Sequence, residues 1–128
     1  MAAHITVTDS GTVSEYDMLI IENCASFTVT HPESAEGLEF TYSQSGSEIS
    51  YNGLEGTARA DNYILNFLYN CLIKAQNLPA EVNKSKNYTV ESAVDNMPFS
   101  LVLSGEGLPL TFTSKGTQIC FTNTAVLN

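Results

Sequence analysis

Residues 61–77 read Asp-Asn-Tyr-Ile-Leu-Asn-Phe-Leu-Tyr-Asn-Cys-Leu-Ile-Lys-Ala-Gln-Asn, and this stretch decides the fold. It is the only segment long enough, and free enough of glycine and proline, to predict a full α-helix. Asp61 suits the N-cap position, because its carboxylate can accept hydrogen bonds from the free N–H groups of the first turn. We therefore expect one main helix over about residues 61–77.

The expected helix has a narrow polar stripe and is apolar elsewhere. The stripe recurs every four residues and consists of Asn62, Asn66, Asn70 and Lys74. A surface helix usually shows the reverse, a single apolar stripe on a polar background. Most of this helix must therefore be covered by the rest of the chain. Three residues expected among its buried contacts are Leu65, Leu68 and Leu72.

The flanking sequence alternates apolar and polar residues in short segments, which is typical of β-strands. The expected strands cover residues 4–8, 15–23, 26–30, 38–42, 48–52, 88–92, 99–103, 108–113 and 117–123. Short turns join most of them, and Gly37 and Gly46 are expected to adopt a positive φ in their loops. Hairpins of this kind indicate an antiparallel sheet with one face on the core and one in water.

The sequence thus predicts an α+β protein with a single domain over residues 1–128. About eight or nine antiparallel strands are expected to curl as a half-barrel around the one main apolar helix. With 43% apolar residues, a chain of 128 residues can bury a sizeable core. No apolar run approaches the ~20 residues of a membrane span. The N-terminal Met-Ala-Ala-His lacks the features of a signal peptide, which leaves a cytoplasmic protein or an exported one without its signal.

The negative charge is concentrated in one half of the chain. The first 58 residues contain nine acidic residues and no Lys or Arg, whereas the rest of the chain is balanced. The net charge of −9 therefore belongs to the N-terminal half. Nucleic acids and anionic membranes bind proteins through clustered Lys and Arg, so neither is an expected partner. A solvated acidic surface and an acidic docking face for a basic partner both fit the pattern.

The three cysteines, Cys24, Cys71 and Cys120, have no metal-ligand spacing and are odd in number. We expect all three to be small buried hydrophobic residues. A Cys24–Cys120 disulfide would be possible if the first and last strands were neighbours. Free thiols would favour a reducing compartment or an anaerobic habitat.

The order of segments also resembles a known group of proteins. The quoted stretches are Phe-Thr-Val-Thr-His-Pro-Glu-Ser-Ala-Glu-Gly-Leu-Glu-Phe (27–40), Glu-Ile-Ser-Tyr-Asn-Gly-Leu (48–54), Gly-Leu-Pro (107–109) and Ile-Cys-Phe-Thr-Asn (119–123). Over about residues 4–123 the chain resembles small Firmicutes lipoproteins of unknown function, which are related in shape to the LolA, LolB and LppX carriers. The resemblance implies a LolA-like half-barrel and an extracytoplasmic, lipid-anchored origin, with the anchor cysteine absent from this sequence. The chain departs from the carriers in being shorter and in having one recognisable helix.

The sequence shows no catalytic residues, and it predicts neither a metal nor a cofactor. Ser104-Gly-Glu-Gly107 indicates a hairpin turn, because a nucleophile elbow needs Gly-x-Ser-x-Gly between a strand and a helix. His4 and His31 stand near no patterned cysteine or acid, so neither indicates a ligand or a base. Three glutamates, Glu33, Glu36 and Glu39, lack the pattern of a calcium loop and predict a solvated rim.

We therefore expect a non-enzymatic extracytoplasmic module that binds an unknown protein or an apolar small molecule. One alternative is a carrier of a lipid-like ligand in the concave face; others are a small hydrolase and a cytosolic adaptor. If a cavity exists, the expected ligand-binding residues are Phe40, Phe67, Leu68, Phe99 and Phe112. Because protein interiors pack densely, these bulky side chains are expected to fill the concave face. Only a small cleft at an open end should remain, and any membrane contact would be made by the removed lipid anchor.

Overall fold

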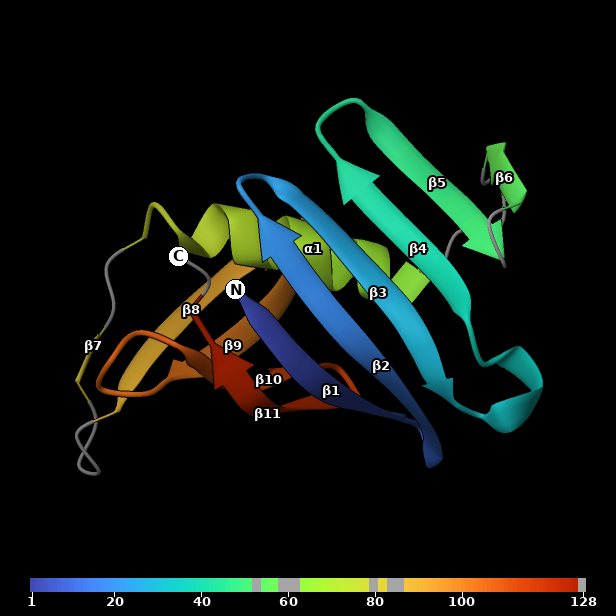
Figure 1. The fold of residues 1–128 in the computed structure, drawn as a ribbon. Coiled ribbons are helices and arrows are strands. Elements are labelled where there is room, and N and C mark those ends of the chain that lie inside the picture. The colour runs from blue at the N-terminus through green and yellow to red at the C-terminus, as the bar shows by residue number, and fades with distance from the viewer. Residues whose placement is uncertain (52–53, 58–62, 79–80, 83–86, 127–128) are drawn as a thin grey trace.

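The computed structural model describes residues 1–51, 54–57, 63–78, 81–82 and 87–126. They form one sheet and one main helix (Figure 1). In chain order the elements are β1 (Ala2–Asp9), β2 (Thr12–Ile21), β3 (Cys24–His31), the 3₁₀ turn η1 (Glu33–Ala35), β4 (Leu38–Ser43), β5 (Gly46–Tyr51), β6 (Leu54–Thr57), α1 (Tyr63–Ala75), β7 (Glu81–Val82), β8 (Tyr88–Val94), β9 (Met97–Leu103), β10 (Pro109–Ser114) and β11 (Thr117–Ala125).

All eleven strands belong to a single antiparallel sheet. Their order is β6-β5-β4-β3-β2-β1-β11-β10-β9-β8-β7. The first and last strands pair at the centre of the sheet, with Ile5 opposite Phe121 and Val7 opposite Ile119. The two edge strands are β6 and β7. In the chain, α1 comes after β6 and before β7. The helical segment is thus the connection between the two edges of the sheet.

The helix lies across one face of the sheet, behind β2, β3 and β4 in the view of Figure 1. Tyr69 stacks on Tyr42 of β4, with ring centroids 5.9 Å apart. Lys74 donates from Nζ to the backbone oxygen of Ala93 in β8 at 2.5 Å. The helix therefore reaches strands in both halves of the sheet, which explains why most of its circumference is apolar.

The buried residues of the helix confirm its expected place in the core. Leu65 and Leu68 are fully buried, and Leu72 is 8% exposed. On the polar stripe, Asn70 and Lys74 are exposed as expected. The expected span of 61–77 exceeds the observed α1 by two residues at each end, and the proposed N-cap, Asp61, lies outside the described residues.

The strands bury alternate residues, as their sequence pattern predicts. On the central strands the buried face carries Ile5, Val7, Phe27, Val29 and Ile119. Their neighbours on the opposite face are mostly threonine, serine and acidic residues. Gly37 and Gly46 adopt the expected positive φ, 91° and 136°. The antiparallel sheet with one helix on one face is therefore confirmed.

The expected curvature is wrong, because the sheet is neither strongly curled nor closed. Strands lie about 4.8 Å apart, so eleven of them span roughly 50 Å. A single helix, about 10 Å across, offers too little surface for such a sheet to wrap around. The sheet also has more strands than the expected eight or nine. Nine of its eleven strands correspond to expected strands, whereas the short edge strands β6 and β7 lie in segments that were expected to be connections.

In the described part of the chain, no helix is both long and apolar enough to cross a membrane.

Candidate functional site

An apolar cleft of about 370 Å³ opens where the C-terminal end of α1 meets the ends of β2 and β9 and the start of β10. We call it the end cleft. Its lining consists of Met1, Ile20, Glu22, Leu72, Ala75, Gln76, Leu101, Leu103, Gly107 and Pro109. The volume lies within the range of about 300–1,000 Å³ that is typical of small-molecule pockets.

The end cleft exists because the helix stops before it covers the strands beneath it. The last turn closes with the N–H of Asn77 donating to the oxygen of Lys74, and that of Leu78 to the oxygen of Ala75. Leu101 on β9 is buried beneath the helix, whereas Leu103, two residues further along the same face, is only half-buried. The cleft is therefore an uncovered margin of the hydrophobic core.

The lining is apolar except for Glu22 and Gln76, both of which are exposed. No Lys, Arg or His is among the lining residues that the structure describes. The ammonium group of Lys74 lies on a neighbouring position of the helix but is directed to Ala93 of β8, which does not line the cleft. The rim carries the carboxylate of Glu22 and the α-ammonium group of Met1, which donates to the backbone oxygen of Ile20 at 2.7 Å.

The five residues expected to bind a ligand lie in the interior away from the end cleft. Phe67 meets Phe112 edge-on at 6.1 Å, and Phe112 stacks on Phe99 at 5.7 Å. Leu68 on α1 and Phe40 on β4 are both buried. Phe67 and Phe112 line a separate cavity of about 230 Å³, whose other lining residues are Asp9, Ile64, Met97, Ser114, Lys115 and Thr117. None of the five lines the end cleft.

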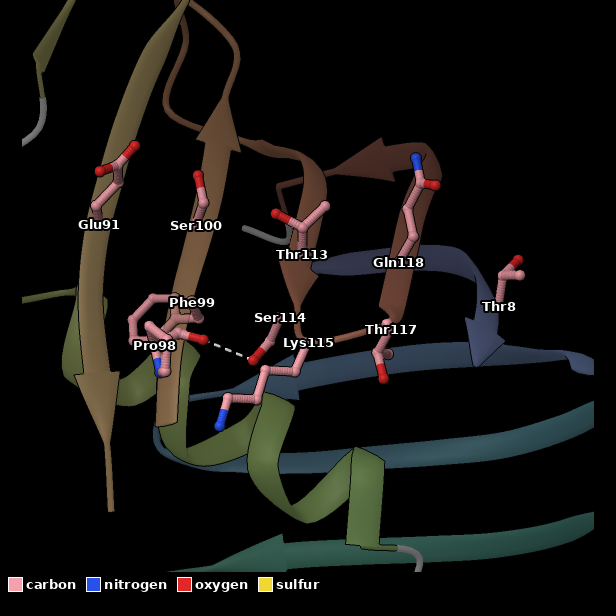
Figure 2. A pocket seen from close by; sticks show the side chains of 11 residues that line it. Thr8, Glu91, Pro98, Phe99, Ser100, Thr113, Ser114, Lys115, Thr117 and Gln118 are labelled. Carbon is pink, nitrogen blue, oxygen red and sulfur yellow. Dashed lines mark hydrogen bonds between the residues drawn. The ribbon is translucent and has the colours of Figure 1, made fainter. Parts of the chain in front are cut away.

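A larger polar hollow of about 640 Å³ lies over β8–β11 and β1 and is open to solvent (Figure 2). Five of its side chains are direct cross-strand neighbours and point away from the helix: Glu91, Ser100, Thr113, Gln118 and Thr8. Nearer the helix, Ser114 donates from Oγ to the backbone oxygen of Pro98 at 2.6 Å. The hollow is an open row of hydroxyl, amide and carboxylate groups with Lys115 at its edge, and it does not enclose a ligand.

His4 lies between two acidic side chains, Glu15 and Asp17. Its Nε2 lies 2.9 Å from Oε1 of Glu15, and its Nδ1 lies 3.0 Å from Oδ1 of Asp17. The sequence pattern did not indicate this contact, because it is the β1–β2 hairpin that brings both carboxylates alongside. The hydrogen bonds to Asp17 and then to Glu15 raise the pKa of His4 above 6.5. All three groups lie at the surface of the sheet and outside every cavity described above.

The other polar residues singled out in the sequence have structural roles or lie in solvent. Ser104 accepts on its Oγ from the N–H groups of Glu106 and Leu108, which confirms the predicted hairpin turn. Glu33 and Glu36 are exposed, as expected for a solvated rim. Glu39 is half-buried and accepts from Oγ1 of Thr28 and of Thr41 at 3.4 and 3.5 Å.

All three cysteines are free thiols. Cys71 lies on α1 and is buried as expected. Burial raises the pKa of its thiol to about 12, so the thiol is inert at neutral pH. The expectation that Cys24 is buried is wrong, because this residue is exposed at the start of β3. Cys120 is only half-buried, since β11 turns Ile119 and Phe121 toward the core instead. Two strands separate β3 from β11, so Cys24 and Cys120 are not neighbours.

Within the described residues, no group of three or more His, Cys, Asp and Glu side chains could hold a metal ion. Compared with models of protein families and with curated proteins, the sequence matches none of them.

Proposed function

We propose that the protein is a non-enzymatic binding module and that it holds a small apolar molecule in the end cleft. One observation carries the proposal: about 370 Å³ of space is bordered mainly by apolar side chains at an uncovered margin of the core. Water in such a space lacks polar partners, so an apolar ligand that displaces it gains the free energy of burial, about 25 cal/mol per Å².

The polar groups support binding rather than catalysis. The hydroxyl of Ser104 is used within its own turn, and the raised pKa of Cys71 keeps that thiol protonated. A nucleophile needs an adjacent base to become reactive. The one described histidine that contacts acids, His4, pairs with Glu15 and Asp17 on the open sheet surface. A surface ion cluster of this kind has no pocket in which to hold a substrate.

The proposal includes the relationship and the location implied by the sequence resemblance. On this view the chain is the soluble domain of a lipid-anchored extracytoplasmic protein related to the LolA-type carriers. Its open sheet with one helix on one face is a simpler arrangement than a full carrier, and its ligand space is correspondingly small. A ligand of about eight carbons is therefore a better probe than a long acyl chain.

Filling the cleft tests the proposal directly. Ala75 is half-buried on the last turn of α1 and lines the cleft, so Ala75→Trp should occupy the space. Asn77→Trp, an exposed position two residues further along that does not line the cleft, is the matched control. We expect octanol to bind the wild type and Asn77→Trp alike in calorimetry, and Ala75→Trp about tenfold more weakly or worse, a difference of ~1.4 kcal/mol. Equal binding to all three proteins, with unfolding midpoints that show each is folded, would contradict the proposal.

A further inference from the structure

The face of the sheet that packs against the helix changes from apolar to polar at one end. On three neighbouring strands, β1, β11 and β10, one row of direct cross-strand partners is apolar and buried: Val7, Ile119 and Phe112. The next row on the same face is polar and consists of Asp9, Thr117 and Ser114. Strand alternation would place apolar side chains at these three positions as well. The polar row lines the cavity of about 230 Å³ beside Phe67 and Phe112, which we call the turn cavity.

The hydroxyl groups of this row already donate within the protein. Thr117 donates from Oγ1 to Oδ1 of Asp9 at 2.9 Å, and Ser114 donates from Oγ to the backbone oxygen of Pro98 at 2.6 Å. A hydroxyl has one proton, so neither side chain has a donor left for a ligand. The carboxylate of Asp9 keeps acceptor positions, because its two oxygens can accept several hydrogen bonds.

Lys115 adds a positive charge at the same place. It lies in the two-residue turn between β10 and β11 and is exposed. In Figure 2 its side chain points to the same side as those of Ser114 and Thr117, opposite to the side chains of the polar hollow. Neither Asp9 nor Lys115 forms an ion pair with a residue that the structure describes. The turn cavity therefore presents one carboxylate and one ammonium group beside an apolar floor of Ile64, Phe67, Met97 and Phe112.

These two charges determine which ligands the turn cavity favours. An apolar amine would pair with Asp9 but would bring a second ammonium group beside Lys115. An apolar carboxylate would pair with Lys115 and meet the like charge of Asp9. A molecule that carries both groups gains two charge-assisted hydrogen bonds and leaves neither charge beside its like. The space lies below the ~300–1,000 Å³ of drug-sized pockets, so such a molecule must be small.

We propose that the turn cavity is a second binding site, which takes a free α-amino acid with an apolar side chain such as leucine. The ammonium group of the ligand pairs with Asp9, its carboxylate pairs with Lys115, and its side chain packs on the apolar floor. The site is separate from the end cleft, because Ile64 and Phe67 line it from the N-terminal half of α1. Each exposed ion pair should change affinity by about two- to fivefold, since water screens Lys115 and the half-buried Asp9.

The test compares leucine with two analogues that each lack one charged group. Isocaproate has the same carbon chain without the amine, and isoamylamine lacks the carboxylate. Titrations followed by backbone amide NMR, at neutral pH and low salt, give both the affinity and the place of binding. The wild type should bind leucine about two- to fivefold more tightly than either analogue. The amide shifts should centre on Asp9, Lys115 and Thr117.

Two variants assign the charges one at a time. Lys115→Gln should remove the advantage of leucine over isoamylamine and keep its advantage over isocaproate. Asp9→Asn should do the reverse, and its amide oxygen can still accept from Thr117. Lys74→Gln and Glu106→Gln are the matched controls, because they change the net charge equally and neither residue lines the turn cavity. Both controls should keep both advantages.

The other outcomes overturn the proposal. Leucine that binds no more tightly than one of its analogues, or does not bind at all, rules out a site for a molecule with both charges. Advantages lost equally in the controls reflect the overall charge of −9 instead of Asp9 and Lys115. Shifts centred on Leu72 and Leu101 place leucine in the end cleft and rule out the turn cavity as its site. The binding of octanol to the end cleft is measured separately, so either proposal can fail alone.

Discussion

Both ring nitrogens of His4 face carboxylates, an arrangement that favours the doubly protonated ring, because only the imidazolium donates from both nitrogens. The side-chain hydrogen bond to Asp17, followed by that to Glu15, raises the pKa of His4 above the 6.5 of an unperturbed histidine. Because the pKa of His4 is raised in the folded state, the contacts of the imidazolium with the two carboxylates stabilise the fold fully below pH 6.5. The stabilisation is lost as the pH rises through the folded-state pKa.

We expect the wild type to lose about 0.5–1 kcal/mol of unfolding free energy between pH 5.5 and pH 8.5 beyond any loss in His4→Gln. The effect is small because Glu15 and Asp17 are 37% and 68% exposed, so that water screens the pair. Urea unfolding at both pH values measures it, and the variant corrects for the titration of all other groups. An identical pH dependence in both proteins would show that His4 is not coupled to stability.

The His4 contacts could have been predicted from the turn that joins β1 to β2. A two-residue turn at Ser10-Gly11 pairs Asp9 with Thr12 and places His4 opposite Asp17. The end cleft could not be predicted in this way. Its place depends on where α1 ends over the sheet, and no sequence period encodes that distance.

At the scale of elements, the helix was the most predictable part of the molecule. Its length, its freedom from glycine and its narrow polar stripe each indicate a largely covered helix, and the burial of Leu65 and Leu68 agrees. The edge strand β6 was missed, although Asn-Gly at 52–53 is a strong hairpin signal between the strands now seen on either side. The two-residue strand β7 has no such signal, since two residues cannot show an alternating pattern.

Leu68→Ala tests whether α1 is the centre of the core. Leu68 is fully buried against the sheet, so its truncation should lower the unfolding free energy by ~2–5 kcal/mol. Asn70→Ala, an exposed position on the same helix, should change it by about 0.5 kcal/mol or less. Urea unfolding compares the two variants. A midpoint of Leu68→Ala close to that of the wild type would remove the helix from the core.

At the scale of the whole molecule, the two halves of the sheet differ in net charge. The acidic first 58 residues supply β1–β6, and the balanced remainder supplies β7–β11. Polyanions are therefore disfavoured as partners of the β1–β6 half. The expected strong curl was wrong because strand periodicity specifies which residues face the core but leaves the curvature to how much surface the helix offers.

The interior between sheet and helix is filled at its centre by the cluster of Phe67, Phe99 and Phe112, and it is open at the end cleft and at the smaller cavity beside Phe67 and Phe112. Locating bound octanol, by a crystal structure of the soaked protein or by NMR contacts between ligand and side chains, tests this division most directly. We predict that the chain of octanol lies against Leu72, Ala75, Leu101 and Leu103. Octanol ordered between α1 and Phe40, Phe99 or Phe112 would contradict it.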